Sequence, residues 1–339
     1  MAKPQKLPSN QFDHFYKGGY KIGALRKGPG GPMRPEEWIG STTTRFGEKT
    51  MGLSTLADGM LLRDAIAADP ESWLGAAHLN AFGTSTELLL KLLDPDQRLP
   101  VHYHPNRAFA KKHLALDHGK TEAWIILEAP ERAHVGLGFA REMKKSEVAS
   151  MVDARDAQGL MDSLQKFEVK KGDAILVPAG TPHSIGEGIF VLELQEPTDL
   201  SALLEWNDFA VDGTKDGHLG LSFDLVLDAL RYSPVESEES ALLVTRNKLT
   251  APGSIFTGAA NPYFRADYIS SQSGSIEYGF GIFLALVGSG RATFESAESL
   301  EITKGDALLV PAQAGSWSVS SVEGVLARPP HPSFTGLAL

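Results

Sequence analysis

The sequence predicts a mainly β protein made of two β-barrels, with a helical insertion in the first barrel and helical connecting segments. Three observations lead to this prediction. Short apolar runs of strand length, bounded by Gly, Pro and charged residues, follow one another from residue 99 onward. Residues 141–166 lack this strand pattern, and their apolar residues occur at helical spacing. A stretch of the first half recurs in the second half, which is typical of two copies of one structural unit.

Length, charge and composition narrow the class of protein. A chain of 339 residues is long enough for two domains with a substantial core. The net charge of −10 argues against nucleic acid as a partner, because two polyanions repel each other. With no cysteine, the chain has no disulfide, thiolate metal site or Cys nucleophile. No apolar run reaches the roughly 18 residues of a membrane helix, so we expect no membrane partner and a cytoplasmic location.

The N-terminal segment, residues 1–80, is expected to be irregular and helical and to pack on the first barrel. Residues 26–35 are rich in Gly, Pro and basic residues, which is typical of irregular chain on a surface. Trp38 and Ile39 form a pair that looks buried. Residues 59–78 have the pattern of two short helices separated by a proline break.

The first barrel, residues 81–218, contains residue types that bind metal ions. His102 and His104 are two apart in an extended run, so both imidazoles project from the same face of a strand. Glu122 comes at the start of the next apolar run, and His183 follows another strand. If these four residues face the interior of one small barrel, they can bind Zn²⁺, Mn²⁺ or Fe²⁺ and leave room for water or substrate.

Two intervals outside the barrels are predicted to be helical. Residues 141–166 read as one or two helices inserted between strands of the first barrel. Residues 219–250 read as a helical connector that leads to the second barrel, residues 251–339, and that starts with an amphipathic stretch.

An internal repeat links the two barrels. Residues 300–312 repeat residues 167–179 at an offset of 133, with Lys-Gly-Asp at the turn in both copies. The offset carries His183 onto Ser316, and no His-x-His precedes the second copy. We therefore expect a second barrel without a metal, whose role the sequence leaves open.

Taken together, these motifs resemble those of the class I mannose-6-phosphate isomerases, zinc enzymes of the cupin superfamily. The resemblance is strongest over residues 80–200. It implies two cupin-type jelly-roll barrels and an aldose–ketose isomerase that interconverts mannose 6-phosphate and fructose 6-phosphate through a cis-enediol. It also implies Zn²⁺ as the metal. The matching stretches are Leu90-Lys-Leu-Leu-Asp94, His102-Tyr-His-Pro-Asn-Arg107, Gly119-Lys-Thr-Glu122 and Pro178-Ala-Gly-Thr-Pro-His183.

The resemblance also implies roles for residues around the metal. Lys120 would lie near the developing oxyanion or take part in proton transfer, and Asp199 would be an acid/base or orienting residue. Lys91 and Arg107 are candidates to bind an anionic group of the substrate. Where this chain has Leu203, the family has an active-site Arg, so either Arg107 replaces that cation or the substrate lacks a phosphate.

Three functions therefore remain open. The first is the mannose-6-phosphate isomerase, the second an isomerase of a non-phosphorylated sugar, and the third a non-catalytic cupin that binds a metal and a sugar. A cupin dioxygenase that uses Fe²⁺ fits less well, because it needs open iron positions but neither Lys120 nor Asp199. The partner in the first three cases is a small sugar or sugar phosphate, and the chain is expected to be a monomer or a homodimer.

Overall fold

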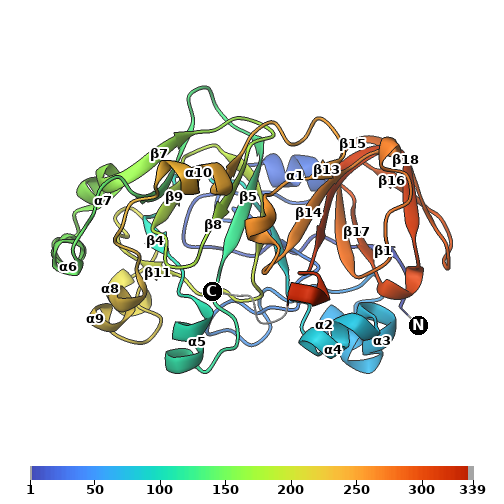
Figure 1. Cartoon of the computed structure of the whole chain (residues 1–339), viewed down its shortest axis with the longest axis horizontal. Helices are drawn as coiled ribbons and strands as arrows, with labels where there is room; N and C mark the ends of the chain where they lie inside the picture. Colours follow the sequence, from blue (N-terminus) through green and yellow to red (C-terminus); the bar gives the residue numbers. More distant parts are fainter. Residues whose placement is uncertain (1, 335–339) are drawn as a thin grey trace.

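Three antiparallel sheets form the framework of the protein, whose residues 2–334 are described by a computed structural model. This confirms the prediction of a mainly β chain. Two of the sheets make up a first unit and the third makes up a second unit, and the two units lie side by side (Figure 1).

The two sheets of the first unit face each other, since side chains from both meet at the site described below. The six-stranded sheet has the strand order β12 (Val244–Thr245), β8 (Ala174–Val177), β5 (Glu122–Glu128), β10 (Phe190–Gln195), β3 (Leu89–Leu93) and β2 (Glu36–Ile39). The five-stranded sheet has the order β11 (Ala202–Leu203), β4 (His102–Tyr103), β9 (His183–Ile185), β6 (His134–Phe139) and β7 (Leu164–Glu168).

The second unit is a single seven-stranded sheet whose two long central strands, β15 and β18, pair over most of their length through two register shifts. Such bulges bend and twist a sheet. Its strand order is β1 (Gln5–Lys6), β17 (Ala307–Val310), β15 (Gly281–Phe294), β18 (Trp317–Arg328), β14 (Arg265–Ile269) and β13 (Gly253–Ser254), and β16 (Leu300–Thr303) also pairs with β15.

Short helices connect and flank the sheets. Helices α6 and α7 lie inside the interval predicted as a helical insertion, and α9, η1 and α10 lie inside the predicted connector. None of the helices within residues 2–334 combines the length and the apolar character that a membrane span needs. The α-helices are α1 (Lys21–Arg26), α2 (Leu62–Ala68), α3 (Pro70–Leu74), α4 (Ala76–Phe82), α5 (Arg107–Leu114), α6 (Lys145–Ala154), α7 (Ala157–Ser163), α8 (Gly213–Asp216), α9 (Phe223–Val226) and α10 (Ser237–Leu243). The 3₁₀ turns are η1 (Leu227–Ala229), η2 (Gly258–Ala260), η3 (Ser271–Ser273), η4 (Ala312–Ala314) and η5 (Pro332–Phe334).

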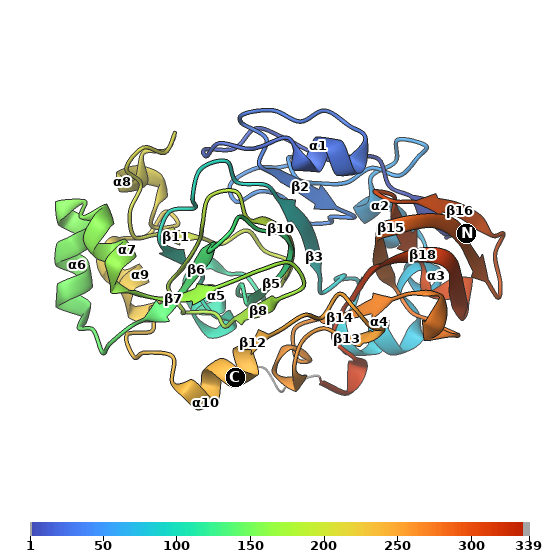
Figure 2. The same cartoon turned by 90° about the horizontal axis from the view of Figure 1, so that it is seen from above.

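The N-terminal segment differs from the expectation that it packs on the first unit, because it contacts both units (Figure 2). Strand β2 extends the six-stranded sheet by pairing with β3, whereas β1 pairs with β17 of the second unit. Helices α3 and α4 lie against η4 and η5, also in the second unit. The buried guanidinium of Arg26 adds a polar link, since it pairs with Glu37 on β2 and donates a hydrogen bond to the carbonyl of Gly305.

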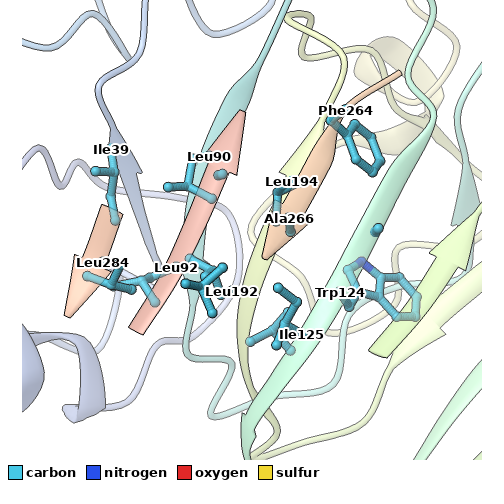
Figure 3. Close-up of a cluster of buried hydrophobic side chains, with 14 of the residues drawn as sticks. Ile39, Leu90, Leu92, Trp124, Ile125, Leu192, Leu194, Phe264, Ala266 and Leu284 are labelled. Carbon is cyan, nitrogen blue, oxygen red and sulfur yellow. The ribbon is translucent and has the colours of Figure 1, made fainter. Parts of the chain in front are cut away.

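The outer face of the six-stranded sheet packs on the second unit, and this contact forms the largest apolar cluster (Figure 3). Leu90 on β3 and Leu192 on β10 point toward side chains such as Leu284 of the second unit. Burying each leucine contributes about 1.5–3 kcal/mol. Because side chains alternate along a strand, Lys91 and Glu193 point to the opposite face, into the first unit.

The internal repeat has the same turn geometry in both copies. Gly172 and Gly305 have φ values of +87° and +91°, which favour glycine. The following aspartates accept a hydrogen bond from the backbone N–H three residues earlier, at 3.1 Å for Asp173 and 2.8 Å for Asp306. The Lys-Gly-Asp signal thus marks one turn built twice, before β8 and before β17.

Candidate metal centre and adjoining cavity

Four donor atoms from the two facing sheets of the first unit converge on one point. His102 on β4 is the registered partner of His183 on β9, and their Nε2 atoms are 3.0 Å apart. Glu122 begins β5 in the opposite sheet, and its Oε1 lies 3.3 Å from Nε2 of His183. His104 follows β4 directly, and its Nε2 lies 2.9 Å from Oε2 of Glu122. The structure therefore brings together all four residues selected as ligands.

The protonation of the three imidazoles follows from their backbone contacts. Each Nδ1 lies within hydrogen-bond distance of a carbonyl oxygen, which can only accept, so each Nδ1 carries the proton. Each Nε2 then presents a lone pair to the common centre. The distances to the carbonyl oxygens are 2.8 Å from His102 to Pro100, 2.6 Å from His104 to Leu200 and 2.8 Å from His183 to Thr181.

Burial keeps these imidazoles neutral. It lowers the pKa of His102 well below the ordinary value, and it lowers the pKa values of His104 and His183 to about 3. Burial would raise the pKa of Glu122, but the positive charge of Lys120 beside it lowers that pKa well below its usual range.

The donor set fits a divalent metal ion. Three imidazole lone pairs and a carboxylate face one another with no proton between them. Two of these atoms, Nε2 of His104 and Oε2 of Glu122, have no hydrogen-bond partner within residues 2–334. Such a group of acceptors requires a cation to be stable. Imidazole and carboxylate suit Zn²⁺, Mn²⁺ and Fe²⁺. The arrangement has the supporting contacts typical of metal sites, since the Trp124 indole N–H donates to Oε1 of Glu122 at 3.0 Å.

Lys120 and Asp199 lie on the wall of a cavity of about 430 Å³ that opens beside the four donors. That volume is within the range of small-molecule sites, about 300–1,000 Å³. Nζ of Lys120 is buried and lies 3.2 Å from Oε2 of Glu122. Oδ2 of Asp199 accepts a hydrogen bond from the backbone N–H of Phe46 at 3.1 Å. Burial opposes ionisation of Asp199, but Lys91 and Lys120 keep its pKa below the ordinary value, so it is a carboxylate.

Lys91 is the middle residue of β3, the strand next to the edge of the six-stranded sheet, and also lines this cavity. The register places Glu193 directly beside it on β10 and Trp38 directly beside it on β2. Its Nζ lies 3.5–3.7 Å from carboxylate oxygens of Glu36, Glu193 and Asp199, and 4.5 Å from the centre of the Trp38 ring. Burial alone would lower the pKa of Lys91, but the three carboxylates raise it above the ordinary value. The ammonium is therefore permanently charged.

Two cavity carboxylates were not selected from the sequence. Glu36 accepts hydrogen bonds from the Tyr16 hydroxyl and the Trp38 indole, both at 2.8 Å. Burial would raise the pKa of Glu36, but His14, Lys91 and these donors lower it well below the ordinary value. Burial and the charge of Glu122 raise the pKa of Glu193 instead. Glu193 is the single charged residue in the apolar run 189–194, the same signal that identified Lys91.

The structure does not bring Arg107 to the cavity wall. Its guanidinium pairs with the buried carboxylate of Glu196 and lies 5.4 Å from the centre of the Tyr263 ring. Arg107 therefore lines neither this cavity nor the second cavity described below, and its binding of an anionic group of the substrate stays a prediction. Leu203 does line the cavity and contributes no charge there, whereas Arg45, which the sequence did not single out, lines it with a guanidinium.

Comparisons with known proteins identify relatives of this chain by sequence and by fold. A mannose-6-phosphate isomerase of Streptococcus mutans is 31% identical over 256 residues, which cover 73% of this chain and 77% of the relative. The crystal structure of the mannose 6-phosphate isomerase from Bacillus subtilis matches with a TM-score of 0.74 at 22% identity, over 96% of this chain and all of that one. A mannose 6-phosphate isomerase bound with zinc and yttrium matches with a TM-score of 0.69 at 15% identity, over 97% of this chain and 100% of that one. No family model matches the chain.

Proposed function

The chain belongs to the mannose-6-phosphate isomerase family, and on this premise we propose that it interconverts mannose 6-phosphate and fructose 6-phosphate through a cis-enediol in a metal-dependent reaction. The observation that carries the proposal is the set of four converging donors without a proton between them. Two of these residues, His102 and Glu122, line the cavity together with Lys120 and Asp199.

We propose that His102, His104, Glu122 and His183 hold Zn²⁺, with Mn²⁺ or Fe²⁺ as alternatives. A divalent ion at this position supplies Lewis acidity, which stabilises the negative charge that develops on the sugar oxygens during enolisation. The second unit offers Ser316 at the position that corresponds to His183, which supports a reaction in the first unit.

Aldose–ketose isomerisation requires a base that takes a proton from C2 and returns it to C1. Asp199 and Lys120 are the proposed groups, because both lie on the cavity wall, where Lys120 is buried and the side chain of Asp199 is 16% exposed. Asp199 is ionised and is oriented by the N–H of Phe46, as a base must be. The Lys120 ammonium can donate a hydrogen bond to a sugar oxygen as negative charge grows there.

We propose that Lys91 holds the acidic side chains of the cavity wall in position and contacts substrate hydroxyls. Its charge is shared between the ionised carboxylates of Glu36 and Asp199, at 3.5 and 3.6 Å, so it offers no spare positive charge to a phosphate. Its fixed position holds Asp199 and Glu193 in place at the rim of the metal centre.

A second candidate, an isomerase of a non-phosphorylated sugar, is favoured by one observation. Leu203 lines the cavity without a charge, and Arg107 is paired with Glu196 away from the cavity. This candidate uses the same metal donors and the same proton chemistry and differs only in the substrate. In either case we propose a cytoplasmic enzyme that acts as a monomer or a homodimer.

Turnover of the zinc-loaded protein on mannose 6-phosphate and, separately, on free mannose tests the proposal, with a chelator-treated sample as control. Conversion of the phosphorylated sugar that the chelator abolishes supports the first candidate. Conversion of free mannose at the same efficiency supports the second. Failure to convert either sugar with metal bound would refute both and leave a binding protein.

A further inference from the structure

The cavity beside the metal centre has four cationic side chains on its wall, and three of them are already neutralised. Lys91 lies within 3.6 Å of the ionised carboxylates of Glu36 and Asp199, and Lys120 pairs with Glu122 at 3.2 Å. Lys215 pairs with Asp212 at 3.1 Å. Among the residues that the structure describes on this wall, Arg45 is the cation that remains for an anionic ligand.

Arg45 has no carboxylate within ion-pair distance among residues 2–334, and its guanidinium contacts only the sulfur of Met51, at 3.7 Å. A thioether is a weak acceptor, so the five N–H donors of the guanidinium are largely unused. A planar guanidinium whose N–H donors are unused is suited to a phosphate, because phosphate oxygens can accept two parallel hydrogen bonds from it.

The loop that carries Arg45 is held in place rather than free. The Arg45 N–H donates to the carbonyl of Met51 at 2.9 Å, and the N–H of Glu48 donates to the carbonyl of Arg45 at 2.9 Å. The next residue, Phe46, donates its N–H to Asp199 at 3.1 Å. The backbone at Arg45 is thereby tied to a proposed catalytic carboxylate.

Arg45 and Asp199 also line a second cavity of about 630 Å³, so the two cavities meet at these residues. Thr43 lies on the wall of the second cavity, two residues before Arg45. Its hydroxyl oxygen is buried and has no hydrogen-bond partner in the part of the chain that the structure describes, and the residue is 9% exposed. A buried hydroxyl without a partner costs free energy unless a ligand satisfies it.

We propose that Arg45, with the hydroxyl of Thr43, binds the phosphate of the substrate where the two cavities meet. Arg45 is then the residue that sets the preference for phosphorylated over free sugars. The inference rests on the proposed function. In this arrangement the phosphate end of the sugar lies toward the second cavity, and the other end lies at the metal.

Arg45→Gln is the direct test, with Arg34→Gln as the matched control. Arg34 is an exposed residue of the same N-terminal segment that pairs with Asp13 and lines neither cavity. In Arg45→Gln we expect kcat/KM for mannose 6-phosphate to fall roughly 10- to 100-fold, mainly through KM, the loss expected for a charge-assisted hydrogen bond. Arg34→Gln leaves it unchanged. Arg45→Lys restores part of the loss, because it keeps the charge but not the fork.

Thr43→Val separates binding from folding. It replaces an unsatisfied hydroxyl by a methyl group of similar volume, so thermal stability should be unchanged or higher while KM for mannose 6-phosphate rises. If Thr43→Val leaves KM unchanged, the hydroxyl has no part in phosphate binding.

Inorganic phosphate separates a failure of this inference from a failure of the proposed function. We expect phosphate to bind the zinc-loaded wild type in a calorimetric titration and to bind Arg45→Gln at least about tenfold more weakly. If the wild type isomerises mannose 6-phosphate but Arg45→Gln has the same KM and the same phosphate affinity, the inference is overturned and the function stands. If the wild type isomerises neither sugar, the function fails, and the phosphate titration alone decides the role of Arg45.

Discussion

Nε2 of His104 lies 2.9 Å from Oε2 of Glu122, and neither atom carries a proton. The proton of His104 is on Nδ1, where it is shared with the carbonyl of Leu200, and the pKa of Glu122 is far below neutrality. Two acceptors at this distance repel each other unless a cation lies between them. This pair is the clearest sign that the polypeptide is shaped for a metal ion.

Glu122→Gln should weaken zinc binding by more than about 100-fold, since even changes to groups behind the ligands cost about 10- to 100-fold. Glu128→Gln is the matched control, because Glu128 lies at the other end of the same strand and is exposed. Competition with a chromophoric chelator measures both affinities. Equal affinities in the two variants would show that Glu122 is not a ligand.

Lys120→Ala should lower kcat on mannose 6-phosphate by about 10²- to 10⁴-fold, the usual range for a residue that stabilises charge or moves a proton. Zinc content and sugar affinity should change far less. Lys112→Ala, an exposed lysine of α5, is the control and should retain wild-type turnover. A variant without Lys120 that turns over normally would favour a purely structural role for this lysine.

The two glutamates beside Lys91 should respond in opposite ways to neutralisation. Glu36 is ionised and accepts two hydrogen bonds from Tyr16 and Trp38, so Glu36→Gln should destabilise the fold by about 3 kcal/mol. Glu193→Gln should cost little, because the raised pKa of Glu193 means that the native carboxyl tends to hold a proton. Urea unfolding at neutral pH compares the two variants, and an equal loss in both would contradict the charge assignment.

The same two pKa shifts predict the pH dependence of stability. The lowered pKa of Glu36 stabilises the fold above the ordinary value of 4.5, and this stabilisation is lost as the pH falls below that value. The raised pKa of Glu193 has the reverse effect, because the folded state retains a proton that the unfolded chain has released, so stability declines as the pH rises above 4.5. Stability of Glu193→Gln should therefore decline less than that of the wild type between pH 5 and 8. A steeper decline in the variant would contradict the raised pKa of Glu193 in the folded protein.

The contact between the two units should make them unfold together. Leu192 is fully buried between the six-stranded sheet and the second unit, so Leu192→Ala should cost about 2–5 kcal/mol. Leu242→Ala, at a leucine that is 56% exposed, is the control and should cost little. Calorimetry should show a single transition that shifts as a whole in Leu192→Ala. Two separate transitions would mean that the units fold independently.

Much of the first unit could be predicted because its signals are local in the sequence. The alternation of His102 and His104 fixes both side chains on one face of a strand, and the Lys-Gly-Asp turn predicts the strands that follow it, β8 and β17. Lys91 stood out because a charge inside an apolar run must find partners in the interior.

The rest depended on contacts between distant segments, which a local pattern does not encode. Nothing near Arg107 in sequence shows that Glu196 takes its charge, and nothing near Arg45 shows that it faces the cavity without a partner. The course of the N-terminal segment over both units is likewise set by β1 pairing with β17 and by Arg26 reaching Gly305. A pattern of turns and short helices carries no information about which sheet it will meet.

The most direct test of the account is a zinc titration of the metal-free protein, with bound metal and conversion of mannose 6-phosphate measured on the same samples. The account predicts that activity is absent without metal, rises in proportion to bound zinc and reaches its plateau at one ion per chain. Full activity in the metal-free protein, or a plateau of bound zinc with no conversion, would contradict it.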